Sequence, residues 1–139
     1  MRPKWLLTHP DGRLMIDKVI SSFLEENPNS FDRIIVTVLN DHCEKYDADT
    51  ILNQVFGKKV EVLSLKNPTS SASETVYETL KQLSVTGKIT IKDTDCLVRS
   101  KLPSSSNHIV GLSVSAKSNI DRVQQKSFII KNDDDIITD

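Results

Sequence analysis

Apolar residues in the first two thirds of the chain alternate between helical spacing and short continuous runs. Between Met15 and Leu24 they recur every three or four positions, which predicts an amphipathic helix that Asn27-Pro28-Asn29 ends. The same spacing over residues 51–56 and 76–83 predicts two further helices. Gly57 directly follows the second of these and is a plausible C-terminal cap.

Three runs of β-branched and apolar residues lie between and after these helices, at 34–39, 60–65 and 89–93. The run at 34–39 is nearly continuous, which suits a strand covered on both faces of a parallel sheet, and the other two runs also predict strands. The order of helices and strands therefore predicts an α/β fold with crossover helices. We expect a three-layer α/β/α domain built on a mixed, mostly parallel sheet.

In the last third of the chain the pattern of apolar residues is different. Val110, Leu112 and Val114 alternate with small residues, which predicts a strand, and the apolar pairs around Asn132–Asp135 predict a hairpin. No linker or repeat divides the sequence, so we expect a single domain over 1–139. The chain opens without a strand beside its first helix and closes in a strand-like run, so this domain is expected to be truncated at both ends.

Charge, cysteine content and hydropathy indicate which partners and which cellular location to expect. The net charge is −1 and the pI about 6.3, with Lys and Arg scattered, which argues against a nucleic-acid partner. Cys43 and Cys96 lack CxxC spacing and are expected to be free thiols of a cytoplasmic protein. No apolar run approaches the roughly 20 residues of a membrane helix, so no membrane partner is expected.

Asp93 and Asp95 end the predicted strand at 89–93. Ligands of open α/β sheets bind beyond the carboxyl ends of the strands. Residues i and i+2 of a strand point to the same face, and paired carboxylates suit a divalent cation that binds phosphates. The alternative is a solvated Asp-Thr-Asp turn.

Two further stretches are candidates for contacts with a nucleotide. The serine-rich loop before the third helix offers backbone N–H groups at a helix start, although Ser71 and Glu74 also have the spacing of a simple capping box. Lys4 precedes an apolar Trp5-Leu6-Leu7 run and is either a point charge for a phosphate or a solvated terminal lysine. The stretch Asp41–Glu44 follows a strand, but no histidine has metal-ligand spacing, so we interpret it as an ordinary loop. The acidic run Asp133–Asp135 lacks the rest of a calcium loop.

In this order the motifs resemble those of the sugar nucleotidyltransferases, in the nucleotide-diphospho-sugar transferase (glycosyltransferase-A-like) superfamily. The closest resemblance is to the capsule and lipopolysaccharide branch. Pro3–Leu7 and Gly12–Ile16 resemble its Pro-Lys-Pro-Leu segment and first helix, Ser70–Tyr77 its Ser-Gly-Gln-Ala-Glu-Thr-Val-Tyr loop, and Ile91–Asp95 its metal-binding strand end. The family's Gly-rich triphosphate loop is absent, and Ser71-Ala72 replaces its Gly-Gln.

The resemblance implies roles for individual residues. Lys4 and Asp95 would be catalytic, Lys4 by contacting phosphate and Asp95 as the main Mg²⁺ ligand, supported by Asp93. The nucleotide would lie along Lys4 and along four residues of the serine-rich stretch, Ser71, Ser73, Glu74 and Thr75.

The implied function is transfer of a nucleoside monophosphate from a nucleoside triphosphate to a phosphorylated acceptor, such as a sugar 1-phosphate, in surface polysaccharide biosynthesis. Three alternatives remain open: a non-catalytic nucleotide-binding remnant, a glycosyltransferase of the same fold, and a subunit completed by a partner. The last would be a homo-oligomer or would pair with a complementing chain, because an unpaired strand edge invites pairing.

Overall fold

The computed structural model describes residues 2–103. The chain divides into two units, Met1–Ser104 and Ser105–Asp139, and the description concerns the first. The predicted strand at 110–114, the hairpin around Asn132–Asp135 and its acidic turn lie outside the described residues. The prediction of one domain over 1–139 depends on that part and stays a prediction.

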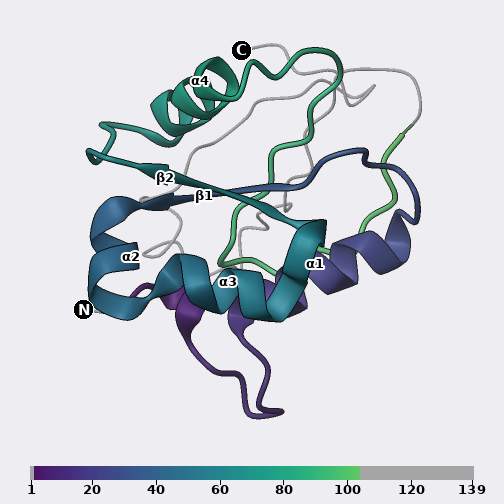
Figure 1. The fold of residues 1–139 in the computed structure, drawn as a ribbon. Coiled ribbons are helices and arrows are strands. Elements are labelled where there is room, and N and C mark those ends of the chain that lie inside the picture. The colour runs from purple at the N-terminus through teal and green to yellow at the C-terminus, as the bar shows by residue number, and fades with distance from the viewer. Residues whose placement is uncertain (1, 104–139) are drawn as a thin grey trace, which may run out of the picture. The chain divides into compact units, whose positions relative to one another are not determined.

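Helices and strands alternate along the described part of the chain, so the α/β class is confirmed (Figure 1). The elements are η1 (Lys4–Leu6), α1 (Met15–Glu26), β1 (Ile35–Leu39), α2 (Asn40–Tyr46), α3 (Ala48–Phe56), η2 (Gly57–Lys59), β2 (Glu61–Leu65) and α4 (Ala72–Gln82). The predicted helices and the first two predicted strands are all present. Gly57 is the C-terminal cap of α3, as predicted, and has a positive φ of 58°.

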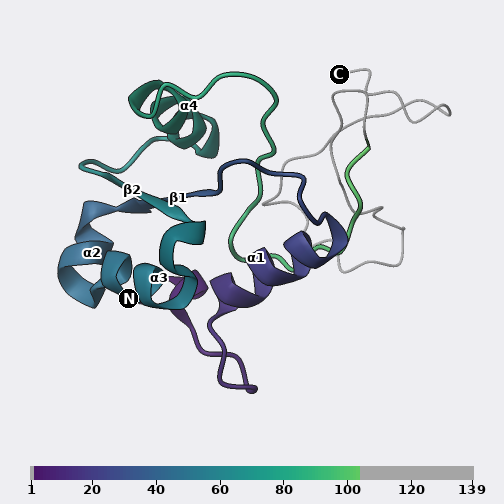
Figure 2. The same cartoon turned by 45° about the vertical axis from the view of Figure 1, so that its right-hand side comes forward.

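A parallel pair of strands forms the centre of the unit. β1 and β2 pair from Ile35–Glu61 to Leu39–Leu65. Helix α4 lies on one side of the pair, and α1, α2 and α3 lie on the other (Figures 1 and 2). Because parallel strands need a long crossover, the connection through α2 and α3 explains why β1 and β2 run in the same direction.

The core lies between the strands and the helices α1 and α3. Alternate residues of β1, Val36 and Val38, point to this side and are buried. They form one cluster with Ile16, Leu52 and Val60, of which Ile16 and Leu52 are fully buried. On the other side, none of the side chains described for α4 is buried, so α4 is the less firmly packed layer.

The predicted buried strand at 89–93 is wrong. Residues 88–93 have no regular secondary structure, and Ile89 and Ile91 are 46% and 63% exposed. Within residues 2–103 the sheet consists of β1 and β2, and this run pairs with neither of these strands. An apolar run forms a strand only where such a partner exists.

The predicted loop over Asp41–Glu44 is also wrong, because these residues belong to helix α2. Two polar pairs spaced i, i+4 stabilise this short helix. Asn40 Nδ2 donates to Glu44 Oε1 at 2.6 Å, and Lys45 Nζ lies 2.6 Å from Asp41 Oδ1. Among the described helices, none is long and apolar enough to cross a membrane.

Asn27 attaches the segment after residue 93 to helix α1. Its buried side chain donates from Nδ2 to the carbonyl of Ser100 at 2.8 Å, and its Oδ1 accepts from the N–H of Leu102 at 2.8 Å. The amide group therefore provides this extended segment with the hydrogen bonds that a neighbouring strand would otherwise make.

Replacing Asn27 with Ala is expected to release this segment. The change removes both hydrogen bonds and leaves two backbone groups unpaired, at a cost of about 1–3 kcal/mol. Hydrogen exchange at the Leu102 amide should accelerate, while exchange in β1 should change only as far as global stability changes. Asn53→Ala, on the exposed face of α3, is the control. Unchanged exchange at Leu102 in Asn27→Ala would contradict this role.

Candidate functional site

A pocket of about 200 Å³ opens at the carboxyl ends of the two strands, next to Leu39 of β1 and Leu65 of β2. This is the edge at which ligands of α/β sheets bind. Two kinds of side chain line it. One part is aromatic, with Trp5 and His42, and the other carries the hydroxyl groups of Thr37, Thr69 and Thr75.

The aromatic part combines η1 with helix α2. The ring of His42 lies 6.0 Å from that of Trp5 and 6.5 Å from that of Tyr46, measured between centroids. Nδ1 of His42 is buried and has no hydrogen-bond partner among residues 2–103. Sequence reasoning missed His42, and its only signal was a position three residues after the end of β1.

The hydroxyl part joins the loop after β2 to the start of α4. Thr69 Oγ1 and Thr75 Oγ1 are 2.5 Å apart, and Thr75 also donates to the carbonyl of Ser71 at 3.2 Å. In the middle of β1, Thr37 Oγ1 lies 2.8 Å from Thr79 Oγ1 of α4. These hydrogen bonds connect α4 to the strands and fix the hydroxyl groups beside the pocket.

Of the four serine-rich-stretch residues predicted to lie along a nucleotide, Thr75 lines the pocket and Ser71, Ser73 and Glu74 do not. Ser71 is the N-cap of α4 and accepts from the N–H of Glu74 at 3.1 Å, so the capping interpretation is confirmed. The reciprocal bond goes to the neighbouring serine, because Glu74 Oε2 accepts from the Ser70 N–H at 2.6 Å and from its hydroxyl at 2.5 Å. Ser73 is exposed.

The two hydrogen bonds from Ser70 lower the pKa of Glu74 below its ordinary value of 4.5. A carboxylate whose pKa is lower in the folded state stabilises that state above its ordinary pKa, and the stabilisation is lost as the pH falls towards the lowered value. We therefore expect the start of α4 to loosen as the pH falls below 4.5. The Ser70 amide chemical shift should titrate in this window in the wild type and not in Glu74→Gln. An identical titration in both proteins would contradict the assignment.

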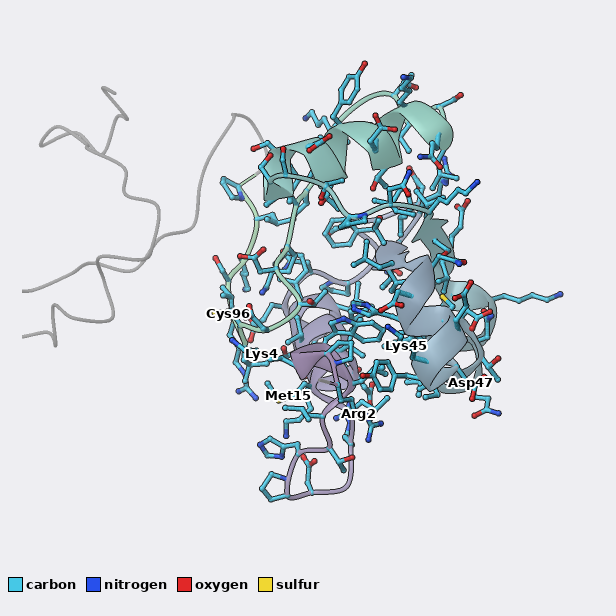
Figure 3. The ribbon with its side chains drawn as sticks, turned by 90° about the vertical axis from the view of Figure 1, so that its left-hand side faces the viewer. Arg2, Lys4, Met15, Lys45, Asp47 and Cys96 are labelled. Atoms are coloured by element: carbon cyan, nitrogen blue, oxygen red, sulfur yellow. The ribbon has the colours of Figure 1, made fainter. Side chains whose placement is uncertain are left out.

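The two residues predicted to be catalytic lie close together in the structure. Lys4 Nζ lies 3.9 Å from Asp95 Oδ2, and their side chains are 80% and 47% exposed. Figure 3 shows Lys4 beside the segment that carries Cys96. A pair this exposed contributes little to stability. Neither Lys4 nor Asp95 lines the pocket, although Lys4 directly precedes Trp5, which does.

Asp93 is exposed, and the structure removes the argument that Asp93 and Asp95 face the same metal ion. That argument was the i, i+2 geometry of a strand, whereas Thr94 and Asp95 form a turn. Lys92 closes this turn, since its Nζ donates to the carbonyls of Asp93, at 2.8 Å, and of Cys96. The structure therefore places Asp95 near Lys4 without showing that Asp93 faces the same point.

The described residues contain no group of three or more His, Cys, Asp or Glu side chains able to enclose a metal ion. Mg²⁺ does not need such a group, because it commonly binds through one or two carboxylates together with substrate phosphates and water. The exposed carboxylate of Asp95 has the hard oxygen atoms that this mode of binding uses. The predicted Mg²⁺ therefore stays a prediction.

A second pocket, of about 140 Å³, lies between α1 and residues 97–99, with Arg13, Lys18 and Arg99 on its walls. Its charges are largely compensated. Arg13 Nε lies 2.7 Å from Asp17 Oδ2, and Lys18 forms an ion pair with Asp11. The hydrogen bond from Arg13 lowers the pKa of Asp17. This pocket is consequently a weaker candidate than the one at the strand ends.

No protein-family model, no curated protein and no solved structure matches this chain significantly.

Proposed function

We propose that this protein is a nucleotidyltransferase that binds the nucleoside end of its nucleoside triphosphate in the pocket at the carboxyl ends of β1 and β2. The observation that carries the proposal is the composition of this pocket. Thr75, from the stretch that resembles a nucleotide loop, lines the same cavity as Trp5, which directly follows the predicted phosphate-binding Lys4. Two motifs far apart in the sequence thus meet at the edge where α/β folds bind ligands.

The phosphate end of the nucleotide would lie towards Lys4 and Asp95. An ammonium group and a carboxylate 3.9 Å apart suit a site that handles both a phosphate chain and a cation. The hard oxygen atoms of Asp95 fit Mg²⁺, which would neutralise charge on the phosphates when bound. Asp93 would support it only if its side chain turns towards the same point.

The reaction would transfer a nucleoside monophosphate to a phosphorylated acceptor such as a sugar 1-phosphate. A phosphate oxygen of the acceptor attacks the α-phosphorus, the bond to the β-phosphate oxygen breaks, and pyrophosphate leaves. Because the attacking oxygen is already anionic, no general base is required. Lys4 would reduce the repulsion between the two anions, and the pocket would position the nucleoside.

The proposal also includes a biosynthetic role, a cellular location and a complete fold. Products of this reaction would serve surface polysaccharide biosynthesis, and the cytoplasm is where nucleoside triphosphates are available. The architecture would be a three-layer α/β/α domain with a mixed, mostly parallel sheet larger than the β1–β2 pair. Its support is that helices lie on both sides of this pair (Figures 1 and 2).

A second candidate is a unit that binds a nucleotide without turnover. It is favoured by the start of α4, where Ser71 and Glu74 are engaged in the helix cap and do not line the pocket. Fewer groups are then free to align a triphosphate for attack.

The test is a calorimetric titration of the full chain with CTP, UTP, GTP and ATP, with and without Mg²⁺, together with a pyrophosphate-release assay using sugar 1-phosphates. Mg²⁺-dependent binding of one nucleotide with release of pyrophosphate is the result expected of a transferase. Binding without release would select the non-catalytic unit. If none of the four nucleotides binds, both candidates are wrong.

A further inference from the structure

Among the described residues, His42 carries a buried side-chain nitrogen without a hydrogen bond, and it lines the pocket. Its Nδ1 is buried and makes no hydrogen bond to any described residue. Leaving a buried polar atom unpaired costs about 1–3 kcal/mol in general, so an exception in a native structure needs an explanation, such as a functional role.

The surroundings of His42 restrict what that partner can be. The ring is positioned by contacts with Trp5 and Tyr46 at centroid distances of 6.0 and 6.5 Å, rather than by a hydrogen bond. A half-turn of the imidazole about its Cβ–Cγ bond would keep these ring contacts and exchange the positions of nitrogen and carbon atoms. His42 lines the pocket, so its ring can turn towards a ligand there without breaking any hydrogen bond that the described structure shows.

The size and walls of the pocket favour a flat ligand. About 200 Å³ is less than the roughly 300–1,000 Å³ of sites for drug-sized molecules, so the space suits one ring system rather than a whole sugar nucleotide. Trp5 offers an aromatic surface for stacking, and base–aromatic stacking contributes about 1–3 kcal/mol per base. The threonine hydroxyl groups complete a partly polar wall.

We propose that His42 recognises the hydrogen-bonding edge of the nucleobase while the base stacks on Trp5. This inference rests on the proposed function, because it takes the occupant of the pocket to be a nucleotide. His42 is then the residue that selects the base, separate from Lys4 and Asp95 at the phosphate end.

The experiment uses AMP, GMP, CMP and UMP in the presence of EDTA, so that metal binding plays no part. Trp5 is the single tryptophan of the chain and lines the pocket, so its fluorescence reports directly on a stacked base. We compare the wild type with His42→Phe, which keeps an aromatic ring but has no nitrogen. His9→Phe, in the loop before α1, is the matched control.

We expect one nucleotide to quench Trp5 fluorescence in the wild type and in His9→Phe with the same Kd. In His42→Phe the Kd should rise about tenfold, the effect of losing one hydrogen bond to a buried polar group. A nucleotide that binds the wild type and His42→Phe equally well would overturn the role of His42 and leave nucleotide binding intact. A wild type that binds none of the nucleotides, in this assay or with Mg²⁺, would overturn the proposed function as well.

A measurement on the wild type tests the same inference without a substitution, in case His42→Phe does not fold. The ¹⁵N chemical shifts of the His42 imidazole should change when the quenching nucleotide is added, because a nitrogen gains a hydrogen-bond partner. His9 shifts should stay constant. Unchanged His42 shifts at saturating nucleotide would overturn the inference independently of any substitution.

Discussion

Replacing Asp95 with Asn is expected to abolish the Mg²⁺ dependence of nucleotide binding. The amide has nearly the same shape, but it removes the negative charge and the carboxylate that we propose as the Mg²⁺ ligand from the position beside Lys4. Changes to residues that merely support a metal ligand cost about 10–100-fold in metal affinity, so loss of the ligand itself should cost about a hundredfold or more. Calorimetric titration of the preferred nucleotide with and without Mg²⁺ measures the effect.

Without Mg²⁺, Asp95→Asn is not expected to weaken nucleotide binding. Asp95 then repels the phosphates and competes with them for Lys4, so Asp95→Asn should bind the nucleotide at least as tightly as the wild type. Asp32→Asn, in the exposed loop between α1 and β1, controls for the loss of one negative charge. An Asp95→Asn protein with unchanged Mg²⁺ dependence would rule out Asp95 as the metal ligand.

Replacing Leu52 with Ala is expected to cause a large loss of stability. Leu52 is fully buried in α3 and belongs to the core cluster that joins this helix to Ile16 and to β1. Truncation of a buried leucine costs about 2–5 kcal/mol through lost burial and the cavity left behind. Since domains of this size are stable by only about 5–15 kcal/mol, a large part of the total would be lost.

Val55→Ala is the matched control, because Val55 lies one turn further along the same helix and is 40% exposed. Its substitution should change the free energy of unfolding by no more than about 0.5 kcal/mol. Urea denaturation followed by circular dichroism compares the two variants with the wild type. Equal midpoints for Leu52→Ala and Val55→Ala would show that the described core is not what stabilises the unit.

Local pattern was sufficient to predict much of the fold. The helices around Ile16, Leu52 and Val76 and the strands at 34–39 and 60–65 follow from the spacing of apolar residues, which reflects which face each element buries. The run at 89–93 begins with β-branched residues as these strands do, and the prediction failed there. Whether a run becomes a strand depends on a neighbour with which to pair, and that is a property of the whole fold.

The candidate site also has residues that the motifs predicted and residues that they did not. The motifs indicated Lys4, Asp95 and Thr75, and the structure puts Lys4 near Asp95 and Thr75 on the pocket wall. The capping residues Ser71 and Glu74 were equally well explained by local chemistry, and the hydrogen bonds of α4 agree with that explanation. His42 could not be predicted, because an isolated histidine has no motif and its significance arises from burial and from contacts with Trp5.

The attachment of Asn27 to residues 100–102 gives helix α1 a role as a spacer. The segment that carries Asp95 is fixed at one end by Asn27, just after α1, and Asp95 itself meets Lys4, which lies before α1. The length of α1 therefore determines where Asn27 stands relative to residues 100–102. One inserted residue would turn Asn27 by about 100° and move it by about 1.5 Å along the helix axis, so its hydrogen bonds to Ser100 and Leu102 would be lost. The length of α1 should thus be less tolerant of change than the identity of its exposed residues.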